Sequence, residues 1–189
     1  MSLGIFRSIR GSYVERSRHL ADLIIRRLNE HLAGIGLPPY TDPDPNERGL
    51  RVLPCGGGAS ASTFQRLETL AASAGLAWTL GSLKGHRQIA LPSHLEGVIS
   101  VNTGHFWFRT PKLQEFCSVE QVSREAVALA PALHVELSHG RLSDDLIRKI
   151  ANEVPFFAGD EEQVLRGLWL DLCLAAQYCL EDARPLVVA

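Results

Sequence analysis

The segment from Leu50 to Gln65 constrains the fold more than any other part of the chain. A short apolar run at 50–55 leads into three consecutive glycines at 56–58, and a serine-rich helix start follows directly. A strand that passes through a glycine turn into a helix N-terminus is typical of proteins that pack helices against a β-sheet. We therefore expect a sheet covered by helices.

The spacing of apolar residues predicts the other elements. Helical periodicity extends over about Ser12–Gly34, Thr63–Ser73, Ser143–Val154 and Asp160–Asp182. Shorter apolar runs predict strands at 50–54, 76–83, 87–91 and 97–102, with a hairpin turn at 84–86. From residue 110 onward the pattern turns helical. This order favours an α+β fold, with a mixed β-sheet of about three to five strands covered by helices and a helical C-terminal half.

Two capping patterns mark helix starts within this order. Ser62 is followed three residues later by Gln65, and Ser118 is followed in the same way by Gln121. A hydroxyl and an amide at this spacing satisfy the free N–H groups of a first helical turn. Both serines are therefore predicted to be N-cap residues.

Length and composition indicate one globular domain over residues 1–189. Its layers would be an N-terminal helix with a proline-rich connector at 1–48, a strand-rich core at 49–109 and a helical part at 110–189. The net charge of −2 argues against a nucleic-acid partner. The apolar runs are too short to cross a lipid bilayer, so we expect no membrane partner. The four scattered cysteines are those of a cytoplasmic protein with reduced thiols, and we expect a protein of bacterial type.

The glycine loop is the first candidate binding site. Backbone amides of Gly57 and Gly58, with the hydroxyl of Ser60 or Ser62, would hold an anion where the loop meets the positive end of a helix. The loop does not match the sequence motifs of catalytic glycine-rich loops. A phosphate loop needs a lysine directly after its last glycine, and a dinucleotide loop needs a glycine where Ala61 stands. The loop is therefore either an anion site or a flexible turn before a capped helix.

Cys55, His86 and His94 are the candidate catalytic residues. A thiol near a helix N-terminus can have a lowered pKa and act as a nucleophile. No base adjoins Cys55 in the sequence, so His86 or His94 would have to approach it in space. The alternative is a plain buried thiol.

A second cluster, His134, Glu136 and His139, contains residue types that bind metals. Neither a strand nor a helix brings all three side chains to one face. Asp42 opens a spacing that resembles a calcium loop, but the glycine and the glutamate that such a loop requires are missing. We therefore expect no metal and no cofactor, with His134 and Glu136 as the only metal-ligand candidates.

Two functions are compatible with these observations. The sequence favours a non-catalytic cytosolic module of bacterial type that binds a protein or a small ligand, as an immunity or regulatory protein does. The alternative is a small enzyme that acts on a phosphate- or carboxylate-bearing substrate held at 55–62.

Overall fold

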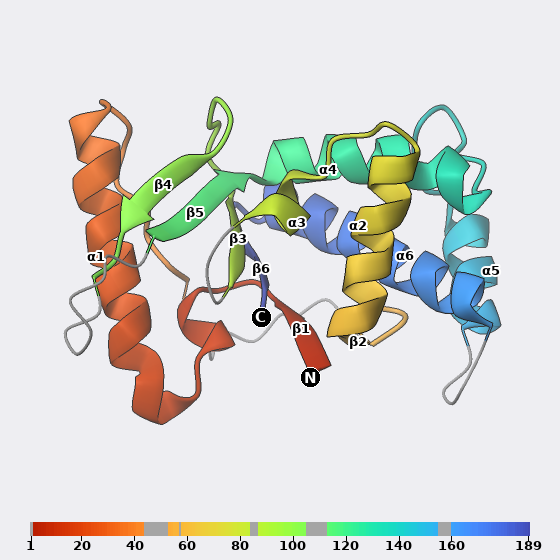
Figure 1. The fold of residues 1–189 in the computed structure, drawn as a ribbon, viewed down its shortest axis with the longest axis horizontal. Helices are drawn as coiled ribbons and strands as arrows, with labels where there is room; N and C mark the ends of the chain where they lie inside the picture. The colour runs from red at the N-terminus through yellow and green to blue at the C-terminus, as the bar shows by residue number, and fades with distance from the viewer. Residues whose placement is uncertain (1, 44–52, 57, 84–86, 105–112, 155–159) are drawn as a thin grey trace.

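A mixed β-sheet runs through the middle of the protein (Figure 1). The structure, a computed structural model, describes residues 2–43, 53–56, 58–83, 87–104, 113–154 and 160–189. Within them the sheet contains β1 (Ser2–Phe6), β6 (Leu186–Val188), β3 (Gln88–Leu91), β5 (Leu113–Ser118) and β4 (Ile99–Asn102), in that spatial order. The three-residue strand β2 (Gly58–Ser60) pairs with the first half of β1 and extends the order to β2-β1-β6-β3-β5-β4.

The pairing directions make the sheet mixed and bring the two ends of the chain together. β3 and β5 are parallel, and every other pair of neighbours is antiparallel. Ile5 of β1 lies opposite Val188 of β6. The first and last strands are therefore neighbours near the centre of the sheet.

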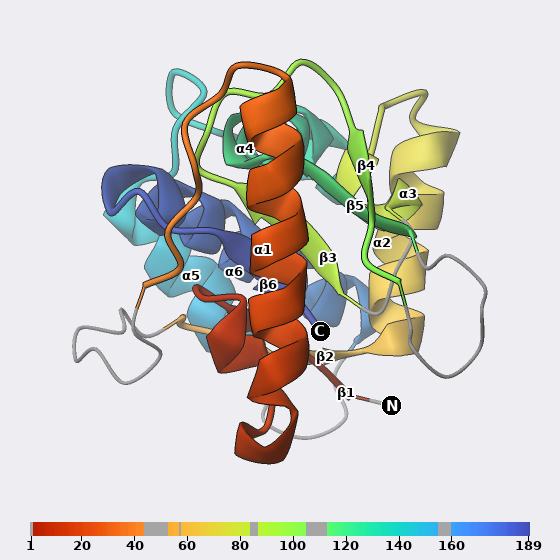
Figure 2. The same ribbon diagram turned by 90° about the vertical axis from the view of Figure 1, so that its left-hand side faces the viewer.

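Helices cover both faces of the sheet. Of the described helices, α1 (Arg18–Gly34) packs on one face, after two 3₁₀ turns at Arg10–Ser12 and Glu15–Ser17 (Figure 2). The opposite face carries α2 (Ala61–Ser73), α3 (Thr79–Ser82), α4 (Val119–Leu129) and α6 (Glu161–Glu181). A 3₁₀ turn at Ala130–Leu133 follows α4, and α5 (Asp144–Glu153) packs against α6.

The central strands separate two apolar cores. Ile89 and Leu91 of β3 contribute to the core under α1, whereas Ala90 between them contributes to the core under α4 and α6. On β5, Phe116 and Cys117 divide in the same way. Successive side chains of a strand point to opposite faces, so a strand buried on both sides is apolar throughout. Three layers result, namely α1, the sheet and the larger helical layer.

The predicted fold class is confirmed, with an α+β arrangement, a mixed sheet and a C-terminal half dominated by helices. The predicted helix starts at Ser118, Ser143 and Asp160 are also found, since each of these side chains accepts a hydrogen bond from a backbone N–H of the first turn. The capping prediction for α2 was wrong by two residues. Ser60, not Ser62, accepts the bond from the Thr63 amide, at 3.0 Å.

Two other predicted elements differ from the structure. The run at 76–83 contains the short helix α3 in place of a strand. Its first amide, Thr79 N, donates to the Glu125 carboxylate of α4 at 2.7 Å, a contact that local sequence does not reveal. Residues 113–118, expected to be helical, form β5. Most of the predicted strand at 50–54 and the turn at 84–86 lie outside the described residues.

Candidate functional site

Two adjoining pockets lie between α4, α6 and the segment 134–142, and we call them together the α4–α6 groove. The inner pocket is the more enclosed and has a volume of about 540 Å³. It is lined by Ser123, Val127, Leu137, Gly140, Arg141, Leu142, Trp169, Cys173, Gln177, Leu180 and Glu181. The outer pocket, of about 800 Å³, is lined by Val127, Ala130, Pro131, His134, Val135, Glu136, Leu137 and Gly140. Val127, Leu137 and Gly140 line both pockets, so the two share a wall.

A tight turn at 138–141 forms one wall of the groove. The Ser138 amide donates to the Arg141 carbonyl at 3.1 Å, and the Arg141 amide donates back to the Ser138 carbonyl at 3.0 Å. His139 and Gly140, between them, have φ values of 53° and 73°. Positive φ at both central residues of a two-residue loop is typical of a type I′ turn. The turn therefore holds Gly140 and Arg141 in a defined position beside the groove.

The floor of the inner pocket is apolar. Trp169 is fully buried, and its indole N–H donates to the Ala126 carbonyl of α4 at 2.7 Å. Cys173, one turn further along α6, is also buried, and burial raises the pKa of its thiol well above the usual range. The thiol therefore stays protonated at neutral pH. This floor therefore offers a fixed apolar base and no nucleophile.

Two charged residues, Arg141 and Glu181, line the inner pocket. Arg141 comes from the turn and is exposed, and it has no ion pair within the part of the chain that the structure describes. Glu181 comes from the last turn of α6 and accepts a hydrogen bond from the Gln177 amide at 3.0 Å. The pocket thus has a cation on the side of the turn and acceptor oxygens on the side of α6.

The structure places the candidate metal ligands in the outer pocket. His134 and Glu136 are both exposed and line its wall. His134 has a φ of 54° and ends the 3₁₀ turn after α4, where its amide donates to the Pro131 carbonyl at 3.0 Å. Among the residues described, no three side chains of metal-binding type lie together.

The glycine-loop residues lie apart from the groove, at the start of α2. The Ser60 hydroxyl is 2.7 Å from the hydroxyls of both Ser62 and Thr63, and it also accepts the Thr63 amide. These hydroxyls therefore bond to one another and to the helix end. Gly58 begins β2, and Gly57 lies outside the described residues.

Cys55 is attached to α6 by a buried carboxylate. Its amide donates to Asp171 Oδ1 at 3.0 Å, and the Asp171 side chain is only 2% exposed. Its sulfur lies against Gly167, where an added Cβ would come within 3.4 Å of it. Burial, with a smaller contribution from the negative charge of Asp171, raises the pKa of the thiol to about 12. This direction is opposite to that expected for a nucleophile at a helix N-terminus.

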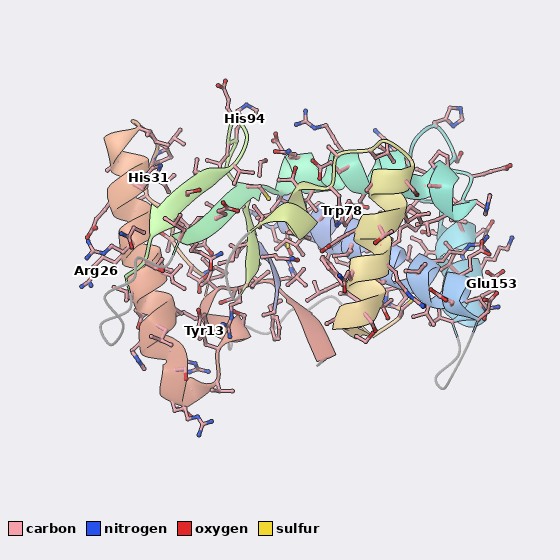
Figure 3. All side chains as sticks on the ribbon, viewed as in Figure 1. Tyr13, Arg26, His31, Trp78, His94 and Glu153 are labelled. Carbon is pink, nitrogen blue, oxygen red and sulfur yellow. The ribbon has the colours of Figure 1, made fainter. Side chains whose placement is uncertain are left out.

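Of the two candidate catalytic histidines, the described residues include only His94, and it does not approach Cys55. His94 is exposed and places Nδ1 3.2 Å from Glu120 Oε2 at the start of α4. Cys55 and Val154 both lie against Gly167 of α6. Glu153, the residue before Val154, therefore marks the end of the molecule where Cys55 lies, and Figure 3 shows His94 far from it. His86 lies outside the described residues.

Asp171 is the residue at this site that sequence reasoning missed. It is a single acid within an otherwise apolar helical stripe, and this isolation was the available signal that its carboxylate has a specific partner.

We expect Cys55 to be alkylated about 50-fold more slowly in the folded protein than in the unfolded chain at pH 8. A rise in pKa from 9.0 to about 12 lowers the thiolate fraction about a thousandfold. The more basic thiolate is also the stronger nucleophile, and this restores about 20-fold of the lost alkylation rate. Iodoacetamide labelling with peptide mass spectrometry, in buffer and in urea, measures the ratio. Labelling of the folded protein at the unfolded rate would contradict the protonated state.

Comparison with protein-family models, curated proteins and solved structures gives no match for this chain. Among the described helices, none combines the length and the hydropathy needed to cross a lipid bilayer.

Proposed function

We propose that this protein is a non-catalytic binding module whose ligand occupies the α4–α6 groove. The observation that carries the proposal is the inner pocket of about 540 Å³, with an apolar floor and polar groups at its rim. Pockets of a few hundred cubic ångströms, mostly apolar and with a few placed polar groups, are the usual form of small-ligand sites. The type I′ turn supports the proposal, because it fixes one wall of the pocket before a ligand arrives.

The chemistry of the lining supports binding rather than catalysis. The cysteine in the inner pocket is kept protonated by burial, and the half-buried Leu137 and Leu180 supply contact area. The alternative, an enzyme that holds an anionic substrate at 55–62, has weaker support. Its thiol is protonated, and the Ser60 hydroxyl is engaged in capping α2. We keep the cytoplasmic, bacterial setting expected from the sequence as part of the proposal.

A small-molecule screen followed by NMR mapping tests this function. We expect compounds that raise the melting temperature to shift amide signals of residues 123–142 and 169–181, and few signals elsewhere. Val127→Trp should abolish this binding, because Val127 is 38% exposed and lines both pockets. The bulky indole would occupy the space between them.

Val98→Trp is the matched control. Val98 is 43% exposed and lines neither pocket of the groove. This variant should bind as the unmodified protein does, and both variants should retain the unmodified circular dichroism spectrum. Hits that map to the start of α2, or hits that survive Val127→Trp, would contradict the proposed site.

A further inference from the structure

We infer that the inner pocket of the α4–α6 groove selects an amphipathic monocarboxylate, with the apolar body against Leu137 and Leu180 above the Trp169 floor and the carboxylate on Arg141. This inference rests on the proposed function and adds the chemical class of the ligand. Such a ligand complements three parts of the pocket, namely its apolar lining, the turn at 138–141 and the C-terminal end of α6.

The apolar body of the ligand is matched by the floor. Trp169 is fully buried as a residue and is fixed by its bond to Ala126, so its position does not depend on the ligand. Leu137 and Leu180 are half-buried and line the same pocket, so they supply the apolar surface that a ligand contacts. A flexible hydrocarbon chain fits such a surface, because contact with it requires burial but no particular hydrogen-bond partner.

The carboxylate is matched by Arg141. Its guanidinium has no ion pair within the described residues, so a ligand anion displaces no protein partner. A guanidinium presents paired N–H donors that fit the two oxygens of a carboxylate. The turn fixes the Arg141 backbone through two hydrogen bonds to Ser138, which limits the entropy lost on binding.

Glu181 disfavours a second negative charge in the pocket. It also lines the pocket and accepts the side-chain amide of Gln177 at 3.0 Å. A dicarboxylate bound in the pocket would bring a second carboxylate near that of Glu181, and like charges at close range disfavour binding. The pocket therefore prefers one carboxylate to two.

Calorimetric titration with three eight-carbon probes tests the inference at pH 7.5. Octanoate should bind about tenfold more tightly than octanol, since a charge-assisted hydrogen bond is worth about one order of magnitude in affinity. Octanedioate should bind more weakly than octanoate. Arg141→Gln should reduce the affinity for octanoate to that for octanol and leave octanol unchanged, and Arg141→Lys should give an intermediate affinity.

Arg148→Gln is the matched control, because Arg148 is an exposed arginine of α5 that pairs with Asp145 at 3.8 Å and does not line the groove. It should keep the preference for octanoate. Octanol that binds in the groove with the same affinity as octanoate would overturn this inference but leave the binding function standing. An octanoate preference that survives Arg141→Gln would overturn it as well, and binding of no probe would count against both proposals.

Discussion

Replacing Asp42 with alanine should destabilise the protein by about 4 kcal/mol, because the change leaves several buried donors without an acceptor. Asp42 is 6% exposed. Its carboxylate accepts the amides of Ile9 and Arg10 at 2.8 and 2.9 Å, and the hydroxyls of Ser8 and Tyr40 at 2.9 and 2.5 Å. It thereby joins the connector after α1 to the 3₁₀ turn after β1.

The buried phenol adds to this dependence. Burial, and then the negative charge of Asp42, raise the pKa of Tyr40 far above its usual value, so its hydroxyl remains a donor. Without the carboxylate, that hydroxyl and two backbone amides would be left in a poorly solvated region, where each unmet donor costs about 1–3 kcal/mol. The separate costs are not additive, and the neighbouring chain will relax in part.

Urea denaturation with two control variants measures the effect. Asp42→Asn keeps the shape and one acceptor oxygen, and should cost about 2 kcal/mol. Asp22→Ala removes an exposed partner of Arg10 and should cost less than about 1 kcal/mol. Equal effects of Asp42→Ala and Asp22→Ala would show that the buried bonds contribute little.

The elements that could be predicted from the sequence are those whose signals are local. The long helices repeat their apolar residues every three to four positions, and serine or aspartate begins three of them. The strand β4 was also predicted, from the short apolar run at 97–102. These features depend on neighbours within a few residues, so one sequence is enough to read them.

The strands that were missed are defined by distant partners. β6 is a three-residue apolar segment whose role as a strand comes from pairing with β1 and β3. β1 likewise requires the other end of the chain. α3 begins where Glu125 of α4 receives the Thr79 amide. Contacts between residues so far apart in the sequence produce no periodic apolar pattern within the short segments that form these elements.

The groove was invisible for the same reason. Its walls come from α4, the turn at 138–141 and α6, and most of its lining residues are ordinary apolar side chains. Chemistry-based reasoning singled out His134 and Glu136, which do line the outer pocket, but as metal-ligand candidates. The signal closest to the inner pocket was the unusually wide apolar surface of the last helix, which indicates a central element but not a cavity beside it.

Replacing Trp169 with alanine should cost about 4 kcal/mol in stability and should remove ligand binding in the groove. A fully buried indole that is truncated to a methyl group leaves a cavity, and substitutions of this size cost about 3–5 kcal/mol. The change also deletes the bond to the Ala126 carbonyl and opens the floor of the inner pocket. Urea denaturation and octanoate titration on the same sample measure the two losses.

Trp78 provides the control, because it is also a buried tryptophan but lies outside the groove. It is 8% exposed, and its indole N–H has no hydrogen-bond partner within the described residues. Trp78→Ala should destabilise the protein without changing affinity for octanoate.

The phenylalanine variants separate the two roles of the indole, which are to fill space and to donate a hydrogen bond. Trp169→Phe should cost about 1 kcal/mol more than Trp78→Phe, because only Trp169 gives up a hydrogen bond. If both alanine variants weaken ligand binding equally, the loss reflects general instability, and Trp169 is not the floor of the site.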